Sequence, residues 1–208
     1  MPNLETPRRR YQGAGRRLAA QATRDSILRA ARSLFAERGF ARTTIEAIAA
    51  QAEVAPQTVY AAFGSKAAIA GEFRFLLERE ADIPKRFQQM LAERDPGRQL
   101  ELVARIDRHV SELHGDVYEL FIDSKEPELA AVRKEMLDAQ RYGMRLLVDS
   151  LVERGALKPG LDSEEAVSVL WAVSSIELYR KLVTQSGWSP ARFERWLGGA
   201  LKALILAG

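Results

Sequence analysis

The feature that most constrains the fold is the spacing of apolar side chains, which follows a helical period from residue 23 to the end of the chain. The first such stripe consists of Ile27, Ala30, Ala31, Leu34 and Phe35. These three- and four-residue intervals place the side chains on one face of a helix. No segment shows the alternation typical of a half-buried strand, and no internal repeat is visible. The sequence therefore predicts an all-α protein of roughly nine helices.

Proline, glycine and capping residues set the expected helix limits. Thr23 is expected to cap the first helix, and Gly39 to end it. Pro56 suits the first position of a short helix, where its missing N–H would be unpaired anyway. The expected helices span 23–38, 44–51, 56–62, 66–82 with a break near Pro84, 96–113, 115–124, 127–154, 163–185 and 190–206.

The most informative segment is 43–66, where two short helices are separated by a tight turn. Ala49 would let the two helices approach closely, Val54 would fill the turn, and Val59 would face inward. This spacing is typical of a helix-turn-helix, whose second helix enters the major groove of DNA. A helical hairpin inside a bundle has the same periodicity, so the pattern alone leaves both alternatives open.

Three polar side chains occupy the other face of the expected second helix. Gln57 can pair with an adenine edge, Thr58 can offer a hydroxyl or a methyl group to a thymine, and Tyr60 can reach a phosphate. These residue types are those that read base edges and the DNA backbone. They are therefore the candidate DNA contacts.

The distribution of charge favours the DNA-binding alternative. The whole chain has a formal net charge of only +3. Residues 1–66 nevertheless contain eleven Lys and Arg against five Asp and Glu, whereas residues 67–208 contain twenty against twenty-three. A net charge of +6 on the first third and −3 on the rest is typical of a nucleic-acid-binding head on a mildly acidic body.

The segment from Ile27 to about Ile69 resembles the DNA-binding head of the TetR (tetracycline-repressor-like) transcriptional regulators. The matching stretches are ILRAARSLFAERGF, TTIEAIAAQAEV and PQTVYAAFGSKAAI. The resemblance implies a homodimer that binds a palindromic DNA operator and is controlled by a small ligand in a larger C-terminal domain. Most relatives are repressors, although activators exist, and the sequence does not decide between the two. We expect a DNA-binding domain at 23–66 and a ligand-binding and dimerisation domain at 67–208.

The resemblance also implies roles for individual positions. Gln57 and Thr58 fall where the family reads bases, and Thr44, Tyr60 and Lys66 fall where it contacts phosphates; Thr43, which could cap the second helix, is a further candidate contact. A helix N-terminus with a nearby ammonium group is also a favourable phosphate site on physical grounds.

Two positions depart from the family pattern. Glu53 occupies a turn position that usually carries glycine, where we expect a left-handed backbone that costs a non-glycine residue about 1 kcal/mol. Ala55 replaces the usual capping Ser or Thr, so we expect the second helix to lack a side-chain cap.

The polar segment 1–22 is predicted to be a flexible basic arm. It contains Arg8, Arg9, Arg10, Arg16 and Arg17. A solvated leader is one alternative for this composition. Its place before a DNA-binding head favours contact with the minor groove or the phosphates.

The body is expected to hold a cavity for a small hydrophobic ligand among its middle helices. The candidate lining residues are Phe73, Leu77, Ile106, His109, Val110, Leu113, Phe121, Tyr142, Leu146 and Trp171. Plain core packing is the alternative for most of them. The two histidines, His109 and His114, are too isolated to indicate a metal site, and no cofactor is expected.

The C-terminal helix is too apolar to remain exposed, so the last two helices are the expected dimer interface. The candidate residues are Leu170, Ser174, Leu178, Phe193, Trp196, Leu197, Ala200, Leu201 and Leu204. Burial within the core of a single chain is the alternative for each of them.

Other functional classes find less support in the sequence. The chain has no Cys, and no nucleophile–base signature or phosphate-binding glycine loop is present, so an enzyme is not expected. No apolar run has the length of a membrane span or an export signal, which indicates a cytoplasmic protein. A helical scaffold that binds protein and not DNA remains the principal alternative.

Overall fold

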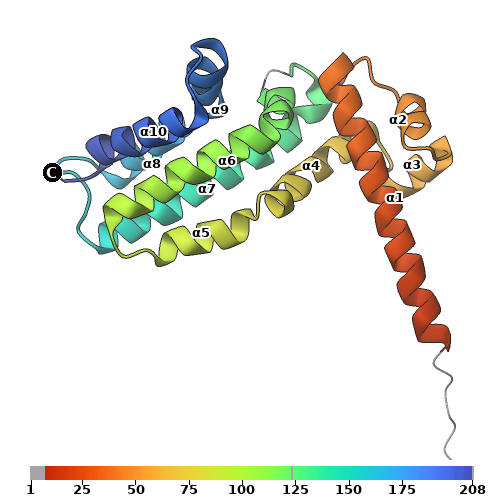
Figure 1. Ribbon diagram of the computed structural model, residues 1–208, viewed down its shortest axis with the longest axis horizontal. Coiled ribbons are helices and arrows are strands. Elements are labelled where there is room, and N and C mark those ends of the chain that lie inside the picture. The colour runs from red at the N-terminus through yellow and green to blue at the C-terminus, as the bar shows by residue number, and fades with distance from the viewer. Residues whose placement is uncertain (1–7, 123, 208) are drawn as a thin grey trace, which may run out of the picture. The chain divides into compact units, whose positions relative to one another are not determined.

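The all-α expectation is confirmed by a computed structural model that describes residues 8–122 and 124–207 (Figure 1). Over these residues the chain forms helices and no β-strand; the side chains of 8–14 and Leu77 are not described. The helices are α1 (Arg8–Arg38), α2 (Ile45–Gln51), α3 (Pro56–Phe63), α4 (Lys66–Glu80), α5 (Ile83–Ala92), α6 (Pro96–Ile122), η1 (Pro127–Leu129), α7 (Ala130–Glu153), α8 (Ser163–Val173), α9 (Ile176–Tyr179), η2 (Arg180–Gln185) and α10 (Pro190–Ile205).

The chain divides into two compact units, and the division lies inside α4. The first unit ends at Phe73 and the second begins at Arg74. The sequence placed a domain boundary after Lys66, at the first residue of α4. The first half of this helix instead belongs with the N-terminal unit, because Ile69, Ala70 and Phe73 are fully buried there, and the Phe73 ring packs edge-on against Phe35.

The apolar stripe of α1 forms the core of the N-terminal unit, as predicted. Its members Ile27, Ala30, Ala31, Leu34 and Phe35 are each at most 5% exposed. Ile48 and Ala49 of α2 are equally buried. The short helices α2 and α3 are thus anchored on a long helix whose spacing is evident in the sequence.

The start of α1 differs from the expectation. The helix begins at Arg8 and extends beyond α2 and α3, whereas the sequence analysis expected a flexible arm up to residue 22 (Figure 1). Thr23 is not an N-cap: its Oγ1 donates to the Ala19 carbonyl, 3.0 Å away, one turn earlier in the same helix. Residues 16–22 are rich in Ala, Arg, Leu and Gln, whose strong helix propensity explains the continuation.

The turn between α2 and α3 has the geometry expected at both unusual positions. Glu53 has φ of 56°, in the left-handed region. The Val54 N–H donates to Ala49 O at 3.0 Å, and the Glu53 N–H donates to Ala50 O at 3.2 Å, which together make a Schellman motif. Ala55 is the N-cap of α3 and makes no side-chain capping bond.

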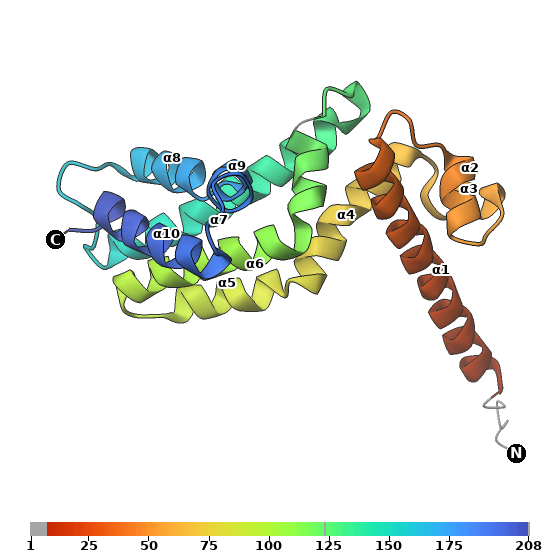
Figure 2. The same ribbon diagram turned by 45° about the horizontal axis from the view of Figure 1, so that its top comes forward.

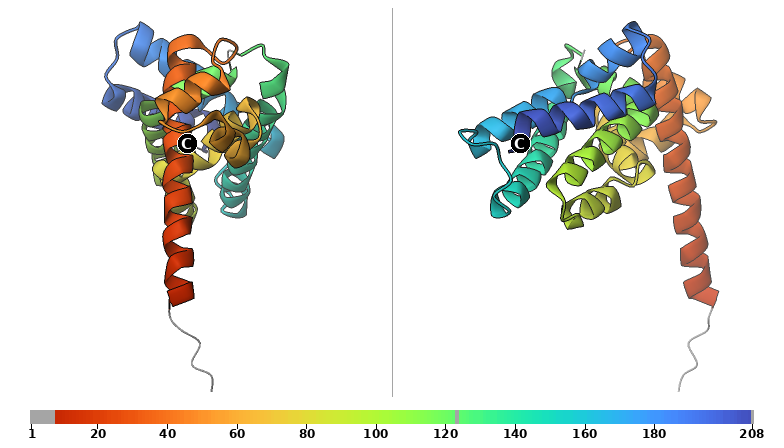
Figure 3. Two further views of the ribbon diagram at one scale, coloured as in Figure 1. Left: turned by 90° about the vertical axis from the view of Figure 1, so that its right-hand side faces the viewer. Right: turned by 60° about the vertical axis from the view of Figure 1, so that its left-hand side comes forward.

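The C-terminal unit is a helical bundle with a continuous apolar core. In it α10 lies along α6, and α7 packs with α8 (Figure 3). The core includes Leu100 of α6, Leu147 of α7, Leu170 of α8 and Leu197 of α10, none of which is exposed. This arrangement brings together segments from the whole C-terminal part of the chain.

Two helices of the bundle are interrupted, one at His114 and one at Ser174. The sequence predicted separate helices before and after residue 114, and α6 is indeed kinked at His114, where φ is −138° (Figure 2). The single helix expected over 163–185 is wrong. The chain leaves helical geometry at Ser174, and the Ser175 hydroxyl then caps α9 by accepting from the Leu178 N–H at 3.3 Å. A serine that can bond nearby backbone competes with continuation of the helix.

In the described part of the chain, no helix combines the length and apolar character needed to cross a bilayer.

The left-handed Glu53 gives a stability prediction. Glu53→Gly should raise the free energy of unfolding by about 1 kcal/mol, because glycine adopts this backbone geometry without steric cost. The matched control is Glu46→Gly inside α2, which should lower it by about 1 kcal/mol. Urea unfolding followed by circular dichroism measures both. Destabilisation by both substitutions would contradict the proposed strain at Glu53.

Candidate functional site

The outer face of α3 presents the side chains predicted to read DNA. Gln57, Thr58 and Tyr60 are exposed, and Tyr60 retains 50% of its accessible surface. Val59, between them, is completely buried. The helix therefore turns one side toward the core and leaves its polar side open, which is the arrangement a groove-reading helix requires.

Two neighbouring threonines at the start of α2 have different roles. Thr44 is exposed and caps the helix, because its Oγ1 accepts from the Ala47 N–H at 3.1 Å. Thr43 is 1% exposed, and its hydroxyl lies within hydrogen-bonding distance of the Leu34 and Gly39 carbonyls, at 3.2 and 2.9 Å. The candidate contact at Thr43 is thus corrected: its side chain fixes the end of α1 and has no surface to offer DNA.

Lys66 holds the loop between α1 and α2. Its Nζ donates to Phe40 O at 2.7 Å and to Thr43 O at 3.0 Å, and it lies 4.2 Å from the centre of the Phe40 ring. The sequence analysis expected a phosphate contact at this position. In the structure the ammonium group donates hydrogen bonds to carbonyl oxygens of this loop. A phosphate contact by Lys66 stays a prediction.

Arg24 connects α1 to the end of α3, a role that sequence reasoning missed. Its guanidinium donates to the Ala62 carbonyl, pairs with Glu72 at 3.2 Å, and lies 4.2 Å from the centre of the Phe63 ring. The last turn of α3 is therefore held by an arginine 38 residues earlier in the chain. No local pattern could reveal this contact.

The basic residues before Thr23 lie on the N-terminal turns of α1. Arg16 and Arg17 are exposed. Arg8, Arg9 and Arg10 belong to the same helix, but their side chains lie outside the described residues. The helix gives these arginines a fixed spacing that a flexible arm would lack.

The C-terminal unit contains a cavity of about 210 Å³. It is lined by Arg74 and Glu78 of α4, Ile83 and Phe87 of α5, Ile106, Asp107, Val110, Ser111, His114 and Tyr118 of α6, Met136, Ala139, Gln140, Gly143 and Met144 of α7, and Ser174, Ser175 and Ile176 from the α8–α9 segment. An adjacent hollow of about 220 Å³ shares Tyr118 and Gln140 with it.

The predicted cavity residues divide into those that line these spaces and those that do not. Ile106 and Val110 line the first cavity, and Trp171 lines the adjacent hollow. Phe73 and Phe121 are buried in core packing, Leu113 and Tyr142 are exposed by 42% and 63%, and neither His109 nor Leu146 lines either space. The side chain of Leu77 lies outside the described part. Helical spacing alone could not separate cavity walls from core, because both are apolar.

Asp107 is the residue in this cavity that sequence reasoning missed. Its Oδ2 is buried and has no hydrogen-bond partner among the described residues. Burial raises the pKa of the Asp107 carboxyl from 3.8 to about 7, and the neighbouring Ser174 hydroxyl opposes this with a smaller effect. The signal in the sequence was an acidic residue at helical spacing between Val103 and Val110, on an otherwise apolar face.

The predicted dimer residues are partly core residues of a single chain. Leu170, Phe193, Leu197 and Leu201 are buried within their own bundle, and Ser174 lines the cavity, so these side chains offer no surface to a partner. Leu178 and Ala200 are half-buried. Trp196 and Leu204 remain exposed by 39% and 44% on α10.

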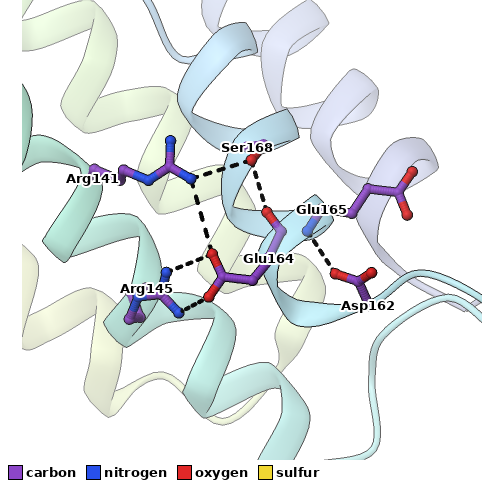
Figure 4. Close-up of polar contacts among 6 residues, drawn as sticks. All are labelled: Arg141, Arg145, Asp162, Glu164, Glu165 and Ser168. Atoms are coloured by element: carbon purple, nitrogen blue, oxygen red, sulfur yellow. Dashed lines mark hydrogen bonds and ion pairs between the residues drawn. The ribbon is translucent and has the colours of Figure 1, made fainter.

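A polar cluster fixes α8 against α7 beside the bundle core (Figure 4). Arg145 binds both carboxylate oxygens of Glu164, one of them at 2.8 Å, and Arg141 lies 3.9 Å from the same carboxylate. Asp162 caps α8 by accepting from the Glu165 N–H at 2.8 Å. The Arg145 guanidinium lowers the pKa of the Glu164 carboxyl. These contacts orient the helix that leads to Ser174.

In the part of the chain that the structure describes, no group of three His, Asp or Glu side chains is arranged to hold a metal ion.

The buried Asp107 predicts a pH-dependent stability difference. Between pH 4 and 7 the folded protein keeps a proton that the unfolded chain releases, so its stability falls as pH rises through this window. Asp107→Asn should therefore stabilise the protein increasingly from pH 4 and level off above pH 7, at no more than about 4 kcal/mol. Urea titrations across this range measure the difference.

The exposed Asp149→Asn in α7 is the matched control and should give no such pH-dependent gain. A constant difference between Asp107→Asn and the unsubstituted protein at all pH values would contradict the raised pKa.

Comparison with known proteins agrees with this geometry. Residues 27–73 match the sequence model of the bacterial regulatory proteins of the tetR family. A search of curated proteins finds no match. The matched segment begins on the apolar stripe of α1 and ends within α4, so it contains the complete α2–turn–α3 motif.

Solved structures of low sequence identity share the fold over most of both chains. NalD, the secondary repressor of the MexAB-OprM multidrug efflux pump in Pseudomonas aeruginosa, is 22% identical with a TM-score of 0.73, covering 90% of this chain and 98% of its own. SmeT in complex with triclosan is 21% identical with a TM-score of 0.72, covering 89% and 92%. A transcriptional regulator from Saccharomonospora viridis in complex with choline is 18% identical with a TM-score of 0.69, covering 89% and 98%.

The helix-turn-helix geometry, the match over residues 27–73 and the shared all-α fold lead to one conclusion. Residues 27–73 form a DNA-binding segment of the tetR type of bacterial regulatory proteins, and the chain as a whole shares the all-α fold of these solved structures.

Proposed function

We propose that this protein is a ligand-responsive repressor that binds a palindromic operator as a homodimer and is released by a small molecule. The observation that carries the proposal is the outer face of α3, where Gln57, Thr58 and Tyr60 are exposed around the buried Val59. A dimer would place two such helices in successive major grooves, about 34–36 Å apart. The fold shared with NalD, which is a repressor, supports repression over activation.

The ligand site of this proposal is the cavity of the C-terminal unit. Arg74 and Glu78 of α4 line it, and Lys66 at the start of the same helix binds the α1–α2 loop. A ligand in the cavity can therefore act on a helix whose other end belongs to the DNA-binding unit. Release requires that the ligand bind more tightly to the form whose heads no longer fit the operator. The triclosan and choline complexes of SmeT and the Saccharomonospora viridis protein support a small organic ligand.

The homodimer of this proposal uses the exposed side of α10. Trp196 and Leu204 are large apolar side chains in this exposed position, and Gly199 and Ala203 between them are small and exposed, which permits close helix crossing. The exposed Ala172 on α8 fits the same role. Burial of these side chains against a second copy would remove apolar surface from water.

DNA binding is tested with a gel shift against the promoter DNA beside the gene of this protein. The double variant Gln57→Ala/Thr58→Ala should lower affinity for the operator about 10- to 100-fold relative to unrelated DNA, since base-edge contacts carry the discrimination. Arg16→Ala/Arg17→Ala should instead weaken binding to all sequences and reduce the salt dependence by about 0.9 per lost phosphate contact.

The control for charge removal is Arg94→Ala/Arg98→Ala, two exposed arginines of the C-terminal unit. This control should leave both affinity and salt dependence unchanged. If no palindromic site near the gene is bound at low salt without ligand, the DNA-binding proposal is lost and a helical scaffold becomes the better interpretation.

The dimer interface is tested with Leu204→Glu. A charge at this position should weaken the homodimer at least about 100-fold, because each protomer loses a buried leucine at a two-fold interface. Light scattering coupled to size-exclusion chromatography measures the mass. The control is Val152→Glu on α7, where the replaced side chain is 46% exposed and the dimer should persist. A dimer unaffected by Leu204→Glu would place the interface elsewhere.

A further inference from the structure

Two buried polar atoms without hydrogen-bond partners meet the same cavity of the C-terminal unit. They are Oδ2 of Asp107 on α6 and Oγ of Ser174 at the end of α8, and both residues line the cavity. The serine hydroxyl is near enough to lower the pKa of the aspartate, but no hydrogen bond of normal geometry joins the two side chains. Buried polar groups without partners are rare, because each costs the free energy of its lost hydration. Two of them at one cavity indicate that a molecule bound there supplies the missing partner.

The charges around the cavity leave Asp107 without a counter-charge. The Arg74 guanidinium pairs with Glu78 at 2.8 Å on the same helix, so these two charges balance. Burial dominates the pKa shift of Asp107, and the only opposing group is the Ser174 hydroxyl, not a cation. Burial raises the pKa of Tyr118 to about 12, and the negative charge of Asp107 adds a smaller effect in the same direction, so this charge acts across the cavity.

The other groups that face Asp107 are known from the cavity lining. On its own helix these are His114 and Tyr118, and on α4 they are Arg74 and Glu78. The lining residues from α5, α7 and the α8–α9 segment have no ionisable side chain. Asp107 is thus the one ionisable lining group, among those described, that can supply an unbalanced negative charge at neutral pH.

The remaining walls select an apolar body of limited size. Ile83 and Phe87 of α5, Ile106 and Val110 of α6 and Met144 of α7 provide apolar surface. The cavity volume of about 210 Å³ exceeds the roughly 150 Å³ of an engineered cavity that holds benzene. It therefore accommodates one aromatic ring with a short chain.

We propose that the ligand of this cavity is a small aromatic or aliphatic amine whose protonated nitrogen binds the Asp107 carboxylate while its apolar body contacts α5, α6 and α7. This inference rests on the proposed function, in which the cavity is the ligand site, and it specifies the ligand as an organic cation. The ammonium N–H groups donate to Asp107 Oδ2 and to Ser174 Oγ, so the two unpartnered atoms receive partners together.

The amine should bind with a characteristic pH dependence. Burial raises the pKa of Asp107 to about 7, and the amine requires the ionised carboxylate. Affinity should therefore fall about tenfold per pH unit below 7 and level off above it, as long as the amine itself stays protonated. A neutral ligand that accepts a hydrogen bond from the protonated acid would show the opposite slope.

The test uses isothermal titration calorimetry of the full-length protein with three probes of similar shape: 2-phenylethylamine, the neutral 2-phenylethanol and the anionic 3-phenylpropionate. At pH 8 the amine should bind at least about 10-fold more tightly than the alcohol, and the anion should not bind measurably. Asp107→Asn should lower amine affinity about 10- to 100-fold and change alcohol affinity less than about twofold.

Two further variants test whether the amine needs the charge at Asp107 and whether it binds in this cavity. Asp149→Asn makes the same chemical change at an exposed position of α7 and should leave amine binding unchanged. Gly143→Leu introduces a side chain at a cavity position where an added Cβ would lie 3.5 Å from the Phe87 ring, so it should fill the cavity and abolish binding of amine and alcohol alike.

The outcomes distinguish this inference from the proposed function. Equal amine and alcohol affinities, both lost in Gly143→Leu, would overturn the cation and keep the cavity as ligand site. Failure of the amine to bind, or binding that is stronger at pH 6 than at pH 8, would overturn the inference whatever the operator assay gives. Amine binding that survives Gly143→Leu would place the site elsewhere and overturn it too.

Discussion

The DNA-reading surface depends on one constraint, which is how little of α3 is buried. Val59 is the only fully buried side chain of this eight-residue helix. A helix this short is not stable alone, and one buried side chain cannot fix its orientation. Its position is therefore determined at its ends, by the Schellman turn around Glu53 before it and by the contact of Arg24 with the Ala62 carbonyl at its last turn.

The local features of this head could be read from the sequence. The stripe of α1, the limits of α2 and α3, the left-handed backbone at Glu53 and the uncapped start at Ala55 all depend on neighbours within a few residues. Predictions about individual polar side chains were less successful. Thr43 is buried and Lys66 binds loop carbonyls, because the end of α1 and the start of α4 approach the same loop, and that approach is a long-range contact.

The cavity also shows that local sequence does not reveal contacts between distant segments. Apolar spacing predicted that the middle helices pack together, and Ile106 and Val110 do line the cavity. It could not show that the helix expected over 163–185 breaks at Ser174, or that this break brings a serine hydroxyl to Asp107. A buried carboxylate without a hydrogen-bond partner raises the free energy of the folded protein, and a ligand that supplies the partner removes this cost on binding. Stability and ligand recognition are therefore linked through the same side chain.

By itself, the sequence determined the all-α class, the helix-turn-helix and the basic character of the first third, because periodicity, turn chemistry and net charge are properties of nearby residues or of simple sums. It did not determine which apolar residues are core, which line a cavity and which remain on the surface. The tertiary structure decided that Leu197 is buried while Trp196 is exposed, and that Asp107 Oδ2 is buried at a cavity with no hydrogen-bond partner among the described residues. The physical reason is that burial and electrostatic environment depend on which helices pack together, and that packing joins segments far apart in the chain.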